Sequence, residues 1–173
     1  MINFNNTGNL EILKSSKIGF LCSQKCPANL ILKTYDWALR QREAGNCIMS
    51  GFHSKIEQDV FYFLLKGSQP MILVLGRGLK QKYPVAISVS MKNNRLLIIS
   101  PFNENIKRVS KETSIKRNEF IFQIADEIFI PFAIKGGSLE SLIIKTNDKT
   151  KIHTFDCDEN KHLTNLGVNS IEI

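Results

Sequence analysis

Long hydrophobic runs and paired cysteines are both missing from this sequence. No apolar run approaches the ~18 residues that a membrane span requires, and the Asn-rich first residues lack the layout of a signal peptide. The four cysteines include no CxxC pair, so neither a disulfide framework nor a structural zinc site is expected. These absences predict a cytoplasmic protein without membrane contact, metal or cofactor.

The common nucleotide and catalytic motifs are also missing. There is no GxxxxGK[ST] sequence, and Gly76 and Gly78 have no third glycine at the spacing of GxGxxG, which removes the usual support for ATP hydrolysis and for NAD chemistry. His53 and Glu57 lie four residues apart, but no third metal ligand is spaced to join them. The sequence therefore predicts a binding protein rather than an enzyme.

What the sequence does have is the composition of a globular domain with a basic surface. Its 173 residues are 43% hydrophobic and 23% charged, enough for one domain with a full core. Lys and Arg outnumber Asp and Glu by 23 to 16, giving a net charge of +7. Such an excess favours an anionic partner, such as nucleic acid or a nucleotide, about as much as it indicates an ordinary solvated surface.

Apolar runs alternate with amphipathic segments from residue 17 onward, which predicts an α/β protein: a Rossmann-like, three-layer α/β/α fold with a mostly parallel sheet of about six or more strands. The expected strands are Lys17–Cys22, Asn46–Ser50, Met71–Leu75, Arg95–Ser100, Glu127–Pro131 and Lys151–Phe155. The expected helices are Ala28–Ala44, Ser54–Lys66, Pro84–Lys92, Ile115–Ala125 and Ser138–Lys145. Ser54 followed by Glu57 has the spacing of a capping box. Residues 1–16 are expected to form an N-terminal arm or one short helix, and residues 17–173 a single domain.

Loops after the strands are where an open α/β sheet binds its ligand. Gly136-Gly137-Ser138 precedes a predicted helix, whose free amides and dipole favour a phosphate; an ordinary turn is the alternative interpretation. Lys116 and Arg117 lie at the expected start of another helix, where two cations oppose the dipole unless an anion is near. Residues 101–114 form a long basic stretch without a clear period.

Several of these segments, in this order, resemble the central domain of the DprA/Smf DNA-processing proteins. Val74-Leu75-Gly76-Arg77-Gly78-Leu79 through Tyr83-Pro84 is similar to the family's VLGxGLxxxYP, and Ser50-Gly51 with Ile56-Glu57 to its SGxAxGID. Ser100-Pro101, Arg117-Asn118 and Gly137-Ser138-Leu139 are similar to its LSE, RNR and SGSLxT segments. Cys22-Ser23-Gln24 replaces part of its VGSR loop, so one pocket arginine is missing.

The resemblance implies a cytoplasmic protein that binds single-stranded DNA during DNA uptake or recombination, with a recombinase and a second copy of itself as possible partners. The implied phosphate-binding residues are Ser23, Lys25, Gly51, Lys82, Arg117, Asn118, Gly136, Gly137 and Ser138. Two alternatives stay open. One is a sensor of a small nucleotide, which the loss of pocket cations favours. The other is a phosphoribohydrolase-like enzyme, because Lys135 to Glu140 is weakly similar to the PGGxGTxxE motif of such enzymes.

Overall fold

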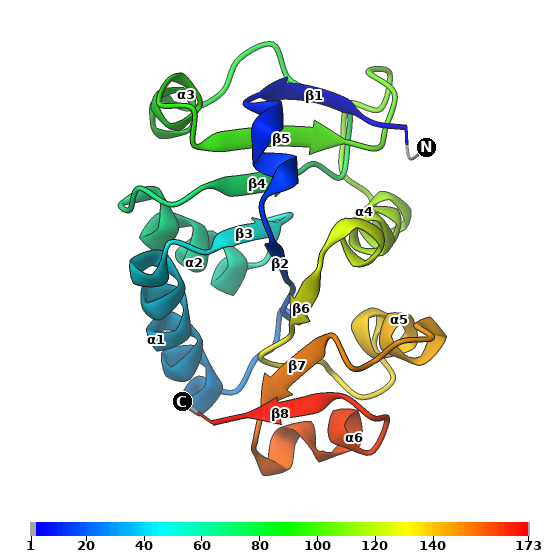
Figure 1. Cartoon of the computed structure of the whole chain (residues 1–173). Coiled ribbons are helices and arrows are strands. Elements are labelled where there is room, and N and C mark those ends of the chain that lie inside the picture. Colours follow the sequence, from blue (N-terminus) through cyan, green and yellow to red (C-terminus); the bar gives the residue numbers. More distant parts are fainter. Residues whose placement is uncertain (1–2, 173) are drawn as a thin grey trace.

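The computed structural model describes residues 3–172 and is built around one eight-stranded sheet. The strands are β1 (Asn5–Gly8), β2 (Lys17–Phe20), β3 (Cys47–Ser50), β4 (Met71–Val74), β5 (Leu96–Ser100), β6 (Glu127–Phe129), β7 (Ile152–Phe155) and β8 (Asn169–Ile171). They lie in the order β1-β5-β4-β3-β2-β6-β7-β8, and only β1 is antiparallel to its neighbour. Figure 1 shows this succession from β1 at the top to β8 at the bottom.

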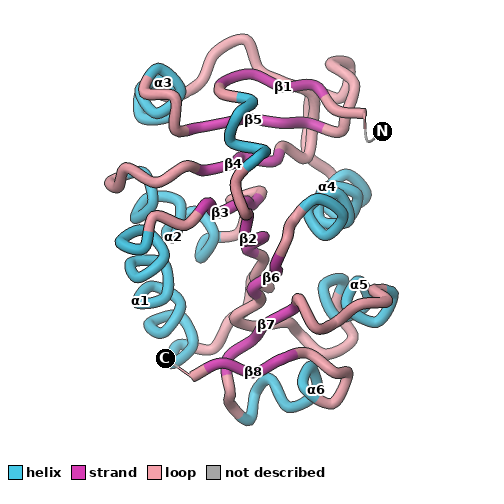
Figure 2. The backbone as a smooth tube through the Cα atoms, in the orientation of Figure 1, coloured by secondary structure: helices cyan, strands magenta, loops and turns pink. Residues whose placement is uncertain are grey.

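Helices cover both faces of the sheet. One side carries α1 (Ala28–Ala44), α2 (Lys55–Leu65) and α3 (Val85–Lys92), and the other carries α4 (Lys111–Ile124), α5 (Ser138–Lys145) and α6 (Lys161–Thr164) (Figures 1 and 2). Short 3-10 helices occupy Leu10–Lys14 and Asp158–Asn160. The predicted Rossmann-like α/β fold is therefore confirmed. Within residues 3–172, no helix is both long enough and apolar enough to cross a membrane.

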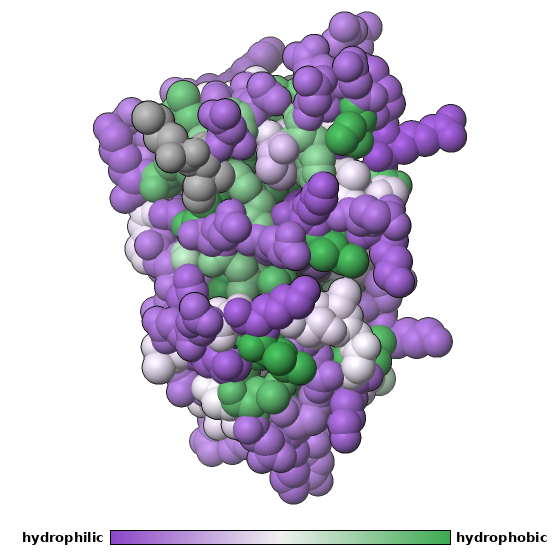
Figure 3. Space-filling model, turned by 90° about the vertical axis from the view of Figure 1, so that its right-hand side faces the viewer, coloured by the Kyte–Doolittle hydropathy of each residue, from purple (hydrophilic) through white to green (hydrophobic). Residues whose placement is uncertain are grey.

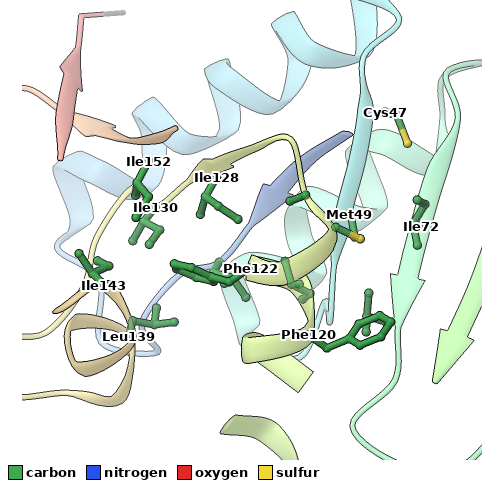
Figure 4. Close-up of a cluster of buried hydrophobic side chains, with 14 of the residues drawn as sticks. Cys47, Met49, Ile72, Phe120, Phe122, Ile128, Ile130, Leu139, Ile143 and Ile152 are labelled. Atoms are coloured by element: carbon green, nitrogen blue, oxygen red, sulfur yellow. The ribbon is translucent and has the colours of Figure 1, made fainter. Parts of the chain in front are cut away.

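The core consists of two layers, one on each face of the sheet. On one face, Phe120 and Phe122 of α4 and Leu139 and Ile143 of α5 approach the strands (Figure 4). On the other, Phe20 and Phe129 of the central strands stack on Trp37 of α1. Because β3, β4 and β5 are buried along their whole length, their sequences are continuous apolar runs, as in parallel sheets covered on both faces.

The sequence placed most elements within a few residues, but it missed β1, β8, α6 and the 3-10 helix Asp158–Asn160, and it placed the start of α4 too late. The N-terminal segment, expected to be an arm or a short helix, contributes the strand Asn5–Gly8, which pairs with β5, and then a 3-10 helix. The strand Asn169–Ile171 and the short α6 were not predicted either. Strands β1 and β8 are polar and lie at the two edges of the sheet, so they carry no apolar pattern.

Helix α4 begins at Lys111, four residues before the predicted start. Ser110 caps it: the Ser110 hydroxyl accepts from the Thr113 amide, and the Thr113 hydroxyl accepts from the Ser110 amide. The expectation that Lys116 and Arg117 lie at a helix start was therefore wrong. The cation in the first turn is Lys111.

Candidate functional site

A hollow lies outside the carboxyl ends of the central strands, where the order of the chain through the sheet reverses. Chain order runs outward from β2 through β3 to one edge and from β6 to the other, and ligands bind at such a switch point, outside the carboxyl ends of the strands. Four segments enclose a cavity of about 560 Å³ there. They are Cys22–Gln24 after β2, the α2 start with His53, Ser54 and Glu57, the α4 start with Val109, Ser110, Lys111, Ser114, Arg117 and Asn118, and the α5 start with Ile134, Gly137, Ser138 and Leu139.

Arg117 is the buried cation of this cavity, with only 4% of its surface exposed. Its Nε and Nη2 atoms donate to Asn118 Oδ1 at 3.1 and 2.9 Å, and within residues 3–172 it forms no ion pair. Burial lowers the pKa of the Arg117 guanidinium below its ordinary value, although the charge of Glu57 acts in the opposite direction. The positive charge is thus only partly compensated by the protein.

Glu57 stabilises the loops around Arg117 instead of pairing with it. Its Oε1 atom accepts from the Cys22 amide at 3.2 Å, and its Oε2 atom accepts from the amides of His53 and Ser54 at 2.7 and 3.2 Å. The Ser54 hydroxyl in turn accepts from the Glu57 amide, which confirms the predicted capping box. One buried carboxylate therefore joins the β2–α1 loop to the start of α2.

Helix α5 presents unoccupied amides to the cavity. Gly137 caps it without a side chain, and among residues 3–172 nothing accepts a hydrogen bond from the amides of Ser138 or Leu139. The preceding loop is held by Ser23, whose hydroxyl accepts from the Ile134 amide at 3.1 Å, and by Glu140, whose Oε2 accepts from the Gly136 amide at 2.5 Å. Free amides at a helix N-terminus are well suited to bind an anion.

Five of the nine predicted site residues line this cavity: Ser23, Arg117, Asn118, Gly137 and Ser138. Gly51 lies directly behind Arg117, since a Cβ atom there would be 2.5 Å from Arg117 Cζ. Gly136 lines a smaller neighbouring hollow. Lys25 and Lys82 are exposed and do not line either hollow.

Sequence reasoning missed Lys111, Val109 and Ile134 as parts of the cavity. Lys111 is a cation in the first turn of α4, where it opposes the helix dipole. Val109 and Ile134 are apolar yet 36% and 38% exposed. The spacing of Ser110 and Thr113, which is that of a helix cap, could have shown that Lys111 begins a helix. Sequence reasoning assigned that stretch to a loop instead.

The lining has the groups that bind an anion. It offers one buried guanidinium, one lysine, free helix amides and hydroxyl groups beside apolar side chains. Glu57, the buried carboxylate, has both oxygens engaged by amides. Among the described residues, no three His, Cys, Asp or Glu side chains gather as a metal site would require.

The fold and its switch-point cavity define a Rossmann-like α/β protein with a buried, partly charge-compensated arginine beside the cavity. A family model described as DNA recombination-mediator protein A matches residues 3–171. The chain belongs to that family, which confirms the resemblance drawn from the motifs. A search of curated proteins finds no match.

Several solved structures share this fold. DNA processing protein A from Helicobacter pylori superposes with a TM-score of 0.78 at 17% identity, over 98% of this chain and 82% of that one. The protein of the same name from Streptococcus pneumoniae gives 0.74 at 20% identity, over 97% of this chain and 62% of that one. A molybdenum cofactor binding protein from Rippkaea orientalis gives 0.59 at 12% identity, over 91% and 90%, and shares the fold.

Proposed function

We propose that this protein binds single-stranded DNA in the switch-point cavity, as a DNA-processing binding protein rather than an enzyme. The Helicobacter pylori protein of similar fold is described as binding single-stranded DNA. The proposed ligand contacts are Arg117, Asn118, Ser23, Gly137 and Ser138, with Lys111 added from the structure. Gly51 keeps space open for the guanidinium.

The observation that carries this proposal is the state of Arg117. A buried cation costs several kcal/mol of solvation unless a counter-charge or hydrogen bonds compensate it. Among residues 3–172, the Arg117 side chain hydrogen-bonds only to the neutral amide of Asn118, and it borders the cavity. A phosphate beside it would supply the missing negative charge, while the α5 amides bind the same or the next phosphate.

Roles in DNA uptake or recombination, hand-over to a recombinase, self-association and a cytoplasmic location belong to this proposal as well. Lys25 and Lys82 enter it as outer contacts with the DNA backbone, since both are exposed cations in loops that follow strands, after β2 and β4.

The test is a titration against a labelled single-stranded oligonucleotide at low and moderate salt, with a duplex control and nucleoside monophosphates as competitors. We expect salt-sensitive binding that prefers the single strand. No binding at low salt would contradict the proposal. A melting temperature that rises with a nucleoside monophosphate but not with an oligonucleotide would favour a nucleotide sensor, and release of a free base from the monophosphate would favour an enzyme.

Two arginine variants separate binding from folding. Arg117→Met removes the charge at similar length, so we expect weaker DNA binding and an unchanged or higher free energy of unfolding. Arg95 is the matched control, because it lies outside the cavity and its guanidinium donates to the carbonyls of Leu64, Leu65 and Gln69. Arg95→Met should lower the free energy of unfolding and leave the affinity for DNA unchanged.

A further inference from the structure

A second hollow of about 290 Å³ runs between α4 and α5, next to the switch-point cavity. It shares Lys111, Gly137 and Ser138 with that cavity and continues to Lys145, the last residue of α5. Figure 3 shows this side of the molecule, which is mostly hydrophilic with separate hydrophobic patches. A ligand at the α5 N-terminus therefore has an open path into this α4–α5 groove.

Lysines border the groove at two distant positions in the chain. Lys111 is the first residue of α4 and Lys145 the last of α5, and within residues 3–172 neither forms an ion pair. Lys145 suits the negative end of its helix dipole, but Lys111 opposes its own. An anion between α4 and the α5 N-terminus would remove that penalty.

The walls between the lysines are apolar. Ile115 of α4 and Leu142 of α5 are half-buried and line the groove together. Glu119 is an acidic residue in the lining, and it reduces the positive field there. An apolar stretch flanked by two cations matches the repeating chemistry of a nucleic-acid strand, in which sugar and base lie between consecutive phosphates.

We propose that the α4–α5 groove binds the nucleotide next to the one in the switch-point cavity, on the same single strand. Lys111 contacts the shared phosphate, Ile115 and Leu142 contact the sugar or base, and Lys145 neutralises the following phosphate. This inference rests on the proposed function and extends it to a binding site longer than one nucleotide.

The experiment compares a thymidine monophosphate with short thymidine oligonucleotides on the full chain, using the variants Lys145→Gln and Glu119→Gln. Lys92 supplies the matched control: like Lys145, it is an exposed lysine that ends an eight-residue helix, but it lies on α3. Lys92→Gln thus reproduces the loss of charge and of helix stabilisation without touching the groove.

We expect Lys145→Gln to weaken oligonucleotide binding about threefold and to reduce the slope of log affinity against log salt by about 0.7, the value for one phosphate contact on a single strand. Glu119→Gln should strengthen oligonucleotide binding, because it removes a negative charge from the groove. Monophosphate binding should change in neither variant. If Lys145→Gln and Lys92→Gln bind the oligonucleotide equally well, the groove assignment is wrong, while the proposed function still stands. If the unchanged protein binds no oligonucleotide, the proposed function fails first and this inference fails with it.

Discussion

The Arg117 guanidinium occupies the space that a side chain at Gly51 would need, with Arg117 Cζ only 2.5 Å from where a Cβ atom of residue 51 would lie. Gly51 follows β3 and Arg117 lies in the second turn of α4, so the contact joins two segments that are far apart in the sequence. The glycine at this position is explained by close approach and not by a positive φ.

Gly51→Ala is therefore expected to displace the guanidinium. The loss in the free energy of unfolding should lie at the low end of the about 1–3 kcal/mol that overpacking costs, because the contacting atoms are the end of a flexible side chain that can shift. DNA affinity should fall because the charge leaves its position. Denaturant unfolding and oligonucleotide titration measure the two effects. In an Arg117→Ala background, Gly51→Ala should lower the free energy of unfolding and the DNA affinity much less, because the clash is gone. Equal costs in both backgrounds would show that the contact with Arg117 is not the cause.

Ser138→Pro tests the free amide at the start of α5. Proline is well tolerated at the first position of a helix, so folding should be retained while one amide donor is lost. A hydrogen bond to a charged phosphate contributes roughly 1.5–3 kcal/mol, so affinity should fall about tenfold or more. Ser138→Ala, which removes only the hydroxyl, should have a smaller effect.

Ala28→Pro is the control for the backbone change, since Ala28 is the first residue of α1 and does not line the cavity. It should leave DNA affinity unchanged. A loss of affinity as large as that of Ser138→Pro would mean that the α5 amide has no specific part in binding.

Glu57→Gln should destabilise the fold, because the carboxylate accepts hydrogen bonds from three backbone amides and an NH₂ group can accept none. The expected loss in the free energy of unfolding is roughly 1–3 kcal/mol, measured by urea titration. Thr113→Ala, at the equivalent position of the α4 cap, should cost only about 1 kcal/mol. A Glu57→Gln cost no larger than that of Thr113→Ala would contradict the role given to Glu57.

The cysteines should react with a thiol reagent in a fixed order. The neighbouring Cys26 thiol, together with burial, raises the pKa of Cys22, and the proximity of Cys22 lowers the pKa of Cys26. Burial raises the pKa of Cys47 to about 12 and also raises the pKa of Cys157. Because the thiolate is the reactive form, Cys26 should be alkylated first near pH 8. Peptide mass spectrometry over time gives the order, and faster labelling of Cys22 than of Cys26 would contradict it.

The sequence was most informative where burial was complete. The runs Met71–Val74 and Leu96–Ser100 were recognisable because strands covered on both faces must be apolar throughout. Asn5–Gly8 and Asn169–Ile171 were not, since an edge strand can be held by backbone pairing alone. Lys111 was missed for a similar reason: a polar cap begins α4, and polar caps resemble loops.

The candidate site was partly predictable. Loops that follow parallel strands must meet at one edge, which brought Ser23, Gly137 and Ser138 together correctly. Which lysines turn toward the cavity depends on helix starts and loop paths, and local sequence does not encode these strongly. For this reason Lys25 and Lys82 were included while Lys111 was not.

Photo-crosslinking is the most direct test of the central claim that the switch-point cavity holds single-stranded DNA. A single-stranded oligonucleotide that carries a diazirine on one base, whose carbene inserts into any neighbouring C–H, N–H or O–H bond, is bound, irradiated and digested, and the attached peptides are identified by mass spectrometry. The account predicts crosslinks in the segments 109–118 and 134–139, lost in Arg117→Met and retained in Arg95→Met. Crosslinks confined to α1, α2 or the β8 edge, unaffected by Arg117→Met, would contradict it.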